Sequence, residues 1–191
     1  MPPVVVLDAC VLYPAAQRDF FMWLAAGGVI RAHWTNEIHN EWMRNVERDY
    51  GVNRGDLERL RKLMDQATGD ALISHYHHHE HLFAKTDVKD RHVAAAAVAA
   101  RKRSKRDIVT IITWNIRDFD CKELVKIGLV VETPDVFLCH LLIDAPKDVI
   151  TAFTSMQSNL RNPPKTVREC ADTLAAQGLK NFAELISVMI D

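Results

Sequence analysis

The fold class is indicated first by the segment VVVLDACVLYPAAQRDF at residues 4–20. It opens with four consecutive apolar and mostly β-branched residues, Val4 to Leu7, and then reaches Asp8. A continuous apolar run of this length is typical of a strand that is buried on both faces, as in a parallel sheet. In such sheets the functional crevice lies at the carboxyl ends of the strands. Asp8 therefore stands where chemistry is expected.

Further strand patterns alternate with helical patterns along the chain. Strands are expected at residues 29–33, 108–113 and 129–131, with a shorter candidate at 71–74. Helices are expected from Asp19 up to Gly27 and over residues 35–50, 56–67, 91–103 and 121–127. This alternation predicts an α/β protein whose parallel sheet is flanked by helices.

From residue 135 onward the patterns are helical only, over residues 135–143, 148–160, 166–177 and 181–189. Pro163-Pro164 and Gly178 interrupt them, as expected for the ends of helices. We therefore expect two parts, an α/β domain at 1–134 and a helical C-terminal extension at 135–191 packed on it. The tail helices are amphipathic and could cover the sheet edge, form a homodimer or hold a partner protein.

Composition excludes several classes of protein. The 191 residues include 24 Lys and Arg against 25 Asp and Glu, so the net charge of −1 argues against nucleic-acid binding through bulk charge alone. No apolar run approaches the roughly 18 residues of a membrane helix, and the N-terminus lacks the basic region of a signal peptide. The four cysteines are scattered, which favours a reduced, cytoplasmic chain with no membrane partner.

Acidic and polar side chains follow the predicted strands or begin the helix that precedes one. They are Asp8, Asp87, Asp90, Asn115 and Asp118. Glu41 flanks the apolar stripe of the helix at 35–50 and can point toward the rim of the core. Clustered carboxylates repel one another and need a cation. All-oxygen ligands select a hard ion, Mg²⁺ or Mn²⁺.

Each acid also has a purely structural explanation. Asp8 could close a strand at a turn, and Asp118 could lie in a loop. Asp87 and Asp90 could cap a helix, and Glu41 could be one more solvated acid. The signals are weak one by one, and their placement at matching ends of strands and helices is what makes them a candidate site.

Four segments, in order along the chain, resemble the motifs of PIN-domain ribonucleases of the VapC toxin type. They are VVVLDACVLYPAAQRDF (4–20) with Asp8, HWTNEIHNEW (33–42) with Glu41, DVKDRHVAAAAVAA (87–100) with Asp90, and TIITWNIRDFD (110–120) with Asp118. Pro134-Asp135 and the tail segment NPPKT at 162–166 resemble one subgroup of that family.

The resemblance implies a three-layer αβα sandwich with a four- or five-stranded parallel sheet and a helical C-terminal extension. It implies RNA cleavage that depends on Mg²⁺ or Mn²⁺, with tRNA or rRNA as the expected target and a cognate antitoxin as partner. It maps the catalytic and metal-binding roles onto Asp8, Glu41, Asp90 and Asp118. Thr113 and Asn115 would line the same pocket.

Two features depart from the family pattern. Some members carry an Asp where this chain has Asn115. The uncharged Asn115 would weaken the binding of a second metal ion here. The histidine-rich segment His75–His81 is no family feature, and its spacing could serve a Zn²⁺ or Ni²⁺ site or simply a polar loop.

Three arginines flank the acidic motifs and are the expected contacts for the RNA backbone: Arg18, Arg91 and Arg117. Arg18 and Arg91 could instead neutralise Asp19 and Asp87. Two alternative functions stay open from the sequence. One is a PIN nuclease of RNA processing that has no antitoxin, and the other is a PIN-like scaffold that binds RNA or protein without catalysis.

Overall fold

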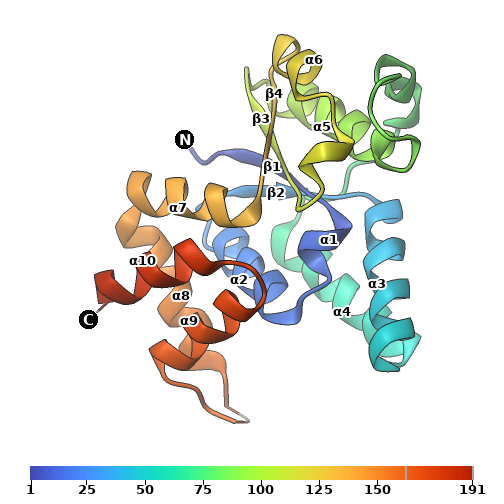
Figure 1. Ribbon diagram of the computed structural model, residues 1–191. Helices are drawn as coiled ribbons and strands as arrows, with labels where there is room; N and C mark the ends of the chain where they lie inside the picture. Colours follow the sequence, from blue (N-terminus) through green and yellow to red (C-terminus); the bar gives the residue numbers. More distant parts are fainter. Residues whose placement is uncertain (162, 191) are drawn as a thin grey trace.

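A computed structural model describes residues 1–161 and 163–190 of the chain. Its centre is a four-stranded, all-parallel sheet in the order β2-β1-β3-β4 (Figure 1). The strands are β1 (Val4–Leu7), β2 (Arg31–His33), β3 (Val109–Ile112) and β4 (Leu129–Glu132). This confirms the predicted α/β class and parallel sheet. The register pairs Val5 with Ala32 on one side of β1 and with Thr110 on the other.

Ten α-helices and three short 3-10 helices lie within the described residues. The α-helices are α1 (Ala9–Leu12), α2 (Ala15–Ala26), α3 (Asn36–Tyr50), α4 (Arg54–Thr68), α5 (Arg91–Ser104), α6 (Cys121–Lys126), α7 (Pro134–Asp144), α8 (Pro146–Asn159), α9 (Val167–Ala176) and α10 (Lys180–Ile190). The 3-10 helices are η1 (His77–Leu82), η2 (Val88–Asp90) and η3 (Ile116–Asp118). None of these helices is long and apolar enough to cross a membrane.

The direction of the chain reverses at β1, and this reversal builds the layers. From β1 the chain moves to β2, then crosses back over β1 to β3 and on to β4. Crossovers between parallel strands are right-handed, so the two directions place their helices on opposite faces of the sheet. Helix α5 packs against β1 and β3, whereas α2 contacts β2. Figure 1 shows α5 and α6 on one side of the sheet and α7 on the other.

Most predicted helices have the expected ends because their caps are readable. The Thr35 hydroxyl accepts a hydrogen bond from the Ile38 amide at the start of α3, and Gly51 ends that helix with a φ of 64°. Left-handed backbone of this kind favours glycine at helix C-termini.

Two expectations were wrong. The helix expected from Asp19 begins at Ala15, because Pro14 fits the position before a helix and two alanines follow it. Residues 71–74 form no strand, only a single bridge between Trp34 and Leu72.

The C-terminal helices pack on α2 through aromatic side chains. The ring of Phe20 lies 5.8 Å from that of Phe153 in α8 and 5.2 Å from that of Phe182 in α10. Buried residues of both parts belong to one hydrophobic core. The division at residue 134 stays a prediction, and Asn162 of the predicted tail motif lies outside the described residues.

The buried carboxylate of Asp135 fastens α10 to α7. It accepts hydrogen bonds from the Phe182 amide at 2.9 Å and from both the backbone and the side chain of Asn181. Asp135 thereby satisfies amides at the start of α10 that no turn of that helix can reach.

Replacing Asp135 with Ala is expected to lower the free energy of unfolding by about 1–3 kcal/mol, because buried donors lose their acceptor. Urea denaturation of the full chain measures this loss. Asp144→Ala, at an exposed position of the same helix, is the control and should change stability by no more than about 0.5 kcal/mol. Equal stability of the Asp135 variant and the parent would show that this contact does not hold the tail.

Candidate active site

Asp8 lies between β1 and α1 with its carboxylate fixed at both oxygens. Oδ1 accepts the Ala9 amide at 2.6 Å, so Asp8 caps the short helix α1. Oδ2 accepts the Thr113 hydroxyl at 2.6 Å and the Cys10 thiol at 3.2 Å. The side chain is buried, and these donors limit it to one orientation at the carboxyl end of β1.

Thr113 joins the ends of β1 and β3, which are neighbours in the sheet. Its hydroxyl donates to Asp8 and accepts the amide of Asn115 at 3.0 Å, which starts the turn that carries Asp118. The Cys10 sulfur accepts the Trp114 amide at 3.3 Å beside them. Burial and the charge of Asp8 raise the pKa of the Cys10 thiol, so it stays a neutral donor. Sequence reasoning did not find this role of Cys10.

Asp90 ends η2 and precedes α5, and it is only 6% exposed. Its Oδ2 atom is buried and has no hydrogen-bond partner within the described residues. Burial, followed by the charge of Asp8, raises the pKa of Asp90 to about 7. A buried, unpartnered carboxylate oxygen beside another carboxylate is unstable as an anion and calls for a cation.

Asp118 reaches the same group from the turn after β3. The backbone carbonyl of Asp118 accepts the Asp87 amide at 2.8 Å, which ties η3 to η2. The ammonium of Lys89 lies 3.1 Å from Asp118 Oδ2 and 3.9 Å from Asp90 Oδ2. Lys89 thus supplies positive charge between two acids, which the sequence patterns did not predict. Asp87 itself is exposed and caps η2 by accepting the Lys89 amide.

Glu41 faces the site from α3 and is half-buried. Burial and the charge of Asp8 raise its pKa, whereas His92 and Arg44 act to lower it. One turn earlier, Glu37 accepts the Tyr76 hydroxyl at 3.2 Å, and the buried Nδ1 of His92 lies 3.8 Å from the same carboxylate. The charge of Asp8 thus acts to raise the pKa of both Glu41 and Asp90, and the charge of Asp118 acts in the same direction on Asp90.

The four carboxylates are ligands of the kind that a hard divalent ion prefers. Their oxygens are not close enough together in this structure to bind one ion. Within residues 1–161 and 163–190 no three His, Cys, Asp or Glu side chains stand close enough together to hold a metal ion. The four carboxylates repel one another, and the only cation paired with them among the described residues is Lys89, beside Asp118 and Asp90. The unpartnered Oδ2 of Asp90 and the all-oxygen character of the set are the two observations that match Mg²⁺ or Mn²⁺.

The predicted RNA-contacting arginines occupy different settings. Arg18 donates to the Leu12 carbonyl at 2.6 Å and lies over the ring of Trp42, with its Cζ 4.7 Å from the ring centroid. Arg91 donates to the carbonyls of Thr86 and Ala84. Arg117 and the predicted pocket residue Asn115 are exposed. All four assignments stay predictions.

The histidine-rich segment forms η1 and packs beside α5. His77 pairs with Glu80 at 2.7 Å, and the Lys102 ammonium lies 3.3 Å from Nε2 of His79. None of these histidines joins two other potential ligands in a metal-binding group among the described residues.

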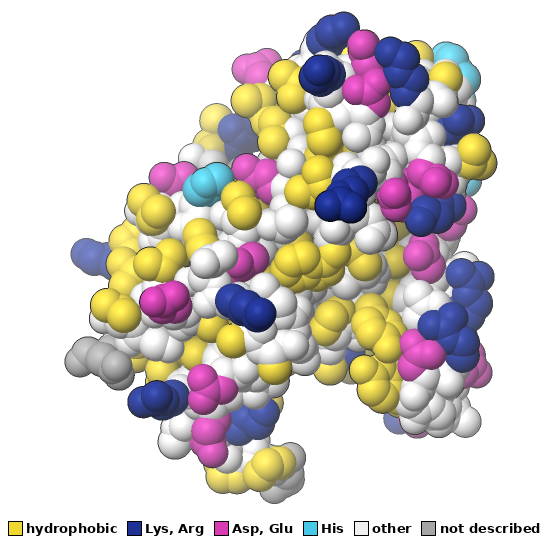
Figure 2. All heavy atoms as spheres, viewed as in Figure 1, with side chains coloured by type: hydrophobic (Ala, Val, Ile, Leu, Met, Phe, Trp, Pro, Cys, Tyr) yellow, Lys and Arg dark blue, Asp and Glu magenta, His cyan; other side chains and the backbone are white. Residues whose placement is uncertain are grey.

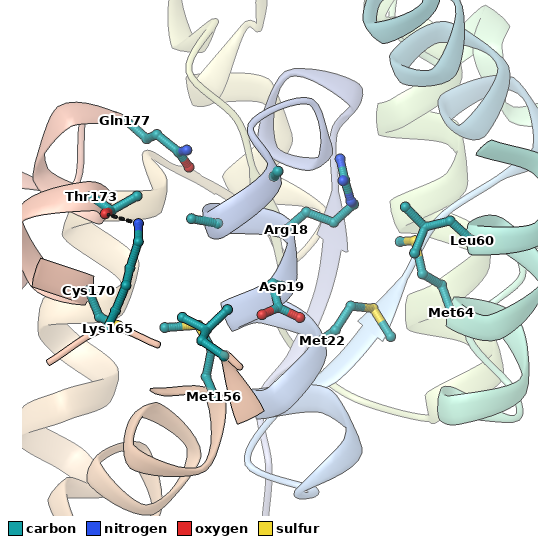
Figure 3. A pocket seen from close by; sticks show the side chains of 13 residues that line it. Arg18, Asp19, Met22, Leu60, Met64, Met156, Lys165, Cys170, Thr173 and Gln177 are labelled. Carbon is teal, nitrogen blue, oxygen red and sulfur yellow. Dashed lines mark hydrogen bonds between the residues drawn. The ribbon is translucent and has the colours of Figure 1, made fainter. Parts of the chain in front are cut away.

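A sizeable cavity of the molecule lies away from these acids. A cavity of about 480 Å³ opens between α2, α4 and the C-terminal helices (Figure 3). Met22, Met64 and Met156 approach it from three different elements, and Arg18 and Asp19 lie on its α2 side. None of the four acids of the candidate site lines this cavity.

A four-stranded parallel sheet covered by helices on both faces, with a helical C-terminal part, defines a PIN-like sandwich with an extension. Residues 134–187 match the family model of the VapC50 C-terminal domain. This match covers α7 to α9 and most of α10, and it confirms the predicted resemblance to the VapC type. A search of curated proteins and a search of solved structures each returned no match.

The raised pKa of Asp90 gives the metal-free protein a defined pH dependence. Below about pH 3 the carboxyl of Asp90 is protonated in both the folded and the unfolded chain, so its ionisation costs no stability. As the pH rises toward 7 the unfolded chain ionises freely and the folded chain does so only at a cost, so stability falls over this window. Asp90→Asn should therefore be more stable than the parent at pH 8, by about 1–3 kcal/mol, and equally stable at about pH 3.

Chemical denaturation in EDTA at the two pH values measures this difference. Asp144→Asn, at an exposed position of α7, is the matched control and should behave as the parent at both. The account of Asp90 is contradicted if its Asn variant is the less stable protein at pH 8.

Proposed function

We propose that the chain is a metal-dependent endoribonuclease of the PIN type, and the toxin of a toxin-antitoxin pair. The observation that carries this proposal is the buried, unpartnered Oδ2 of Asp90, whose carboxyl is destabilised as an anion by the neighbouring Asp8. The match of residues 134–187 to a VapC-type domain supports the same reading from another part of the chain.

Asp8, Asp90 and Asp118 are the residues that would hold Mg²⁺ or Mn²⁺, with Glu41 as the fourth carboxylate. Such an ion supplies Lewis acidity and offsets the negative charge that grows on a phosphodiester during displacement. Thr113 and Cys10 hold Asp8 in one orientation, and this preorganisation avoids the cost of ordering the carboxylate when substrate binds.

RNA is the proposed substrate, and the cations at the rim are its proposed contacts. Arg117 is exposed on η3, directly before Asp118, and Lys89 is exposed on η2. Their charges can meet phosphates that approach the acids, and salt should therefore weaken binding. A tRNA or an rRNA as target, and an antitoxin that covers the site, follow from the VapC resemblance.

Asp8→Asn tests catalysis directly. The variant keeps the side-chain shape and an acceptor for Thr113, and it loses the charge that an ion needs. RNA cleavage in Mn²⁺ should fall by at least about 100-fold, the order of effect for the loss of a preorganised charged group. Mapping of new RNA 5′ ends after induction, for the parent, Asp8→Asn and the control Asp144→Asn, measures it. Cleavage by Asp8→Asn at the parent's rate would overturn the proposed function.

One observation favours a second candidate, a PIN-like scaffold without catalysis. Lys89 already places an ammonium between Asp118 and Asp90, so the acids could be neutralised without a metal ion. Under our proposal Lys89 competes with the ion, and Lys89→Met should bind Mn²⁺ more tightly by a few-fold, the effect of an exposed ion pair.

Mn²⁺ titration followed by electron paramagnetic resonance separates the two. Lys62→Met, an exposed lysine of α4, is the control and should leave Mn²⁺ affinity unchanged. Absence of Mn²⁺ binding in the parent and in the Lys89 variant alike would favour the scaffold.

A further inference from the structure

A second, larger cavity of about 740 Å³ lies where the end of α1 meets the C-terminal end of α3. Its lining is mostly apolar and comes from the α1–α2 junction, α3, α4 and Gln177. Figure 2 shows hydrophobic side chains gathered on the surface between α1 and α3. The volume falls in the range of ligand pockets in proteins.

Two tyrosines from different elements line this cavity. The ring centroids of Tyr13 and Tyr50 are 5.8 Å apart, with an interplanar angle of 33°. Tyr50 is 67% exposed, so its ring is not needed for the core. The Tyr13 hydroxyl donates to Asp49 at 2.9 Å, which holds its ring in place. An open aromatic pair of this kind offers a flat apolar face to an incoming planar group.

The charges of the cavity suit a neutral planar group better than a phosphate. Arg18 and Asp56 contribute one cation and one anion to its lining. Arg18 is held by the carbonyls of Leu12 and Tyr13 through one nitrogen, Nη1. A guanidinium and a carboxylate together can donate to and accept from the edge of a nucleobase. A phosphate would instead be repelled by the acid.

The cavity is close enough to the acids to receive part of the same RNA strand. Tyr13 follows Asp8 by five residues, mostly along α1, and Tyr50 follows Glu41 by nine residues along α3. At 1.5 Å per helical residue these spans are about 7 and 13 Å. Nucleotides rise about 3.4 Å each when stacked, so the tyrosines lie within a few nucleotides of the scissile bond.

We propose that the cavity at Tyr13 and Tyr50 is a base-binding subsite, which takes one unpaired nucleobase of the RNA beside the cleavage site. The proposal rests on the proposed function for its substrate class. Stacking on aromatic side chains is how proteins bind bases of single-stranded RNA, and Arg18 reads the edge of the base. The subsite would select targets in which that base is unpaired, such as a loop.

The test measures binding without cleavage. Short single-stranded RNAs carry one 2-aminopurine at successive positions and are titrated into the Asp8→Asn protein in EDTA. One position should show strong fluorescence quenching by stacking. Adding Tyr50→Ala should abolish that quenching and weaken binding about 5- to 100-fold. Tyr50→Phe keeps the ring and should keep both signals.

The outcomes separate this proposal from the proposed function. RNA binding of equal strength and equal fluorescence in Asp8→Asn with and without Tyr50→Ala would overturn the subsite and leave the nuclease standing. Absence of RNA binding by the Asp8→Asn protein at every position would overturn both. Similar quenching at every position of the 2-aminopurine along the RNA would also overturn the proposal of a defined subsite.

Discussion

The hydrogen bond from Thr113 to Asp8 is the contact on which the rest of the site depends. It joins the carboxyl ends of β1 and β3, the two strands between which the direction of the chain reverses. Helices leave this point toward opposite faces of the sheet, so a crevice opens there that no crossover covers. The same Thr113 hydroxyl accepts the Asn115 amide and so fixes the start of the turn that carries Asp118. The topology of the sheet therefore creates the crevice, and Thr113 orients the carboxylate of Asp8 within it.

Electrostatic repulsion is the constraint that shapes the remaining residues. Asp90 is buried and unpartnered at one oxygen, and Glu41 and Asp90 both have raised pKa values because of burial and of Asp8. Such an arrangement is costly for folding alone, since an apolar core residue would pack without the penalty. Acids that are kept together in one place despite this electrostatic cost are typical of a functional site. Lys89 offsets part of it from the solvent side.

Much of the fold could be predicted because its signals are local. Val4 to Leu7 is an apolar run, and Thr35 and Gly51 are helix caps, so β1 and α3 follow from neighbouring residues. The places of Asp8 after β1 and of Asp90 before α5 follow by the same means, since a strand end and a helix start are readable. The strand predicted at residues 71–74 was wrong, because a short apolar segment does not reveal whether a neighbouring strand is long enough to pair with it.

The parts that could not be predicted depend on contacts between distant segments. Lys89 meets Asp118 across 29 positions of the chain, and Tyr13 meets Tyr50 across 37. No periodic pattern in the sequence indicates that the two residues of either pair lie close together. Cys10 was judged by the absence of a partner cysteine, whereas its role is set by Thr113 and Trp114 at the end of β3.

We propose that Asp8 and Asp90 form one cation site together with Asp118 and Glu41. Anomalous X-ray diffraction from crystals of the full chain grown with Mn²⁺ tests it most directly. The account predicts one strong manganese peak within about 2–2.5 Å of carboxylate oxygens of both Asp8 and Asp90, with the Lys89 ammonium displaced from Asp118. A structure in which these acids keep their present positions, and in which manganese is absent or lies elsewhere on the surface, would contradict it.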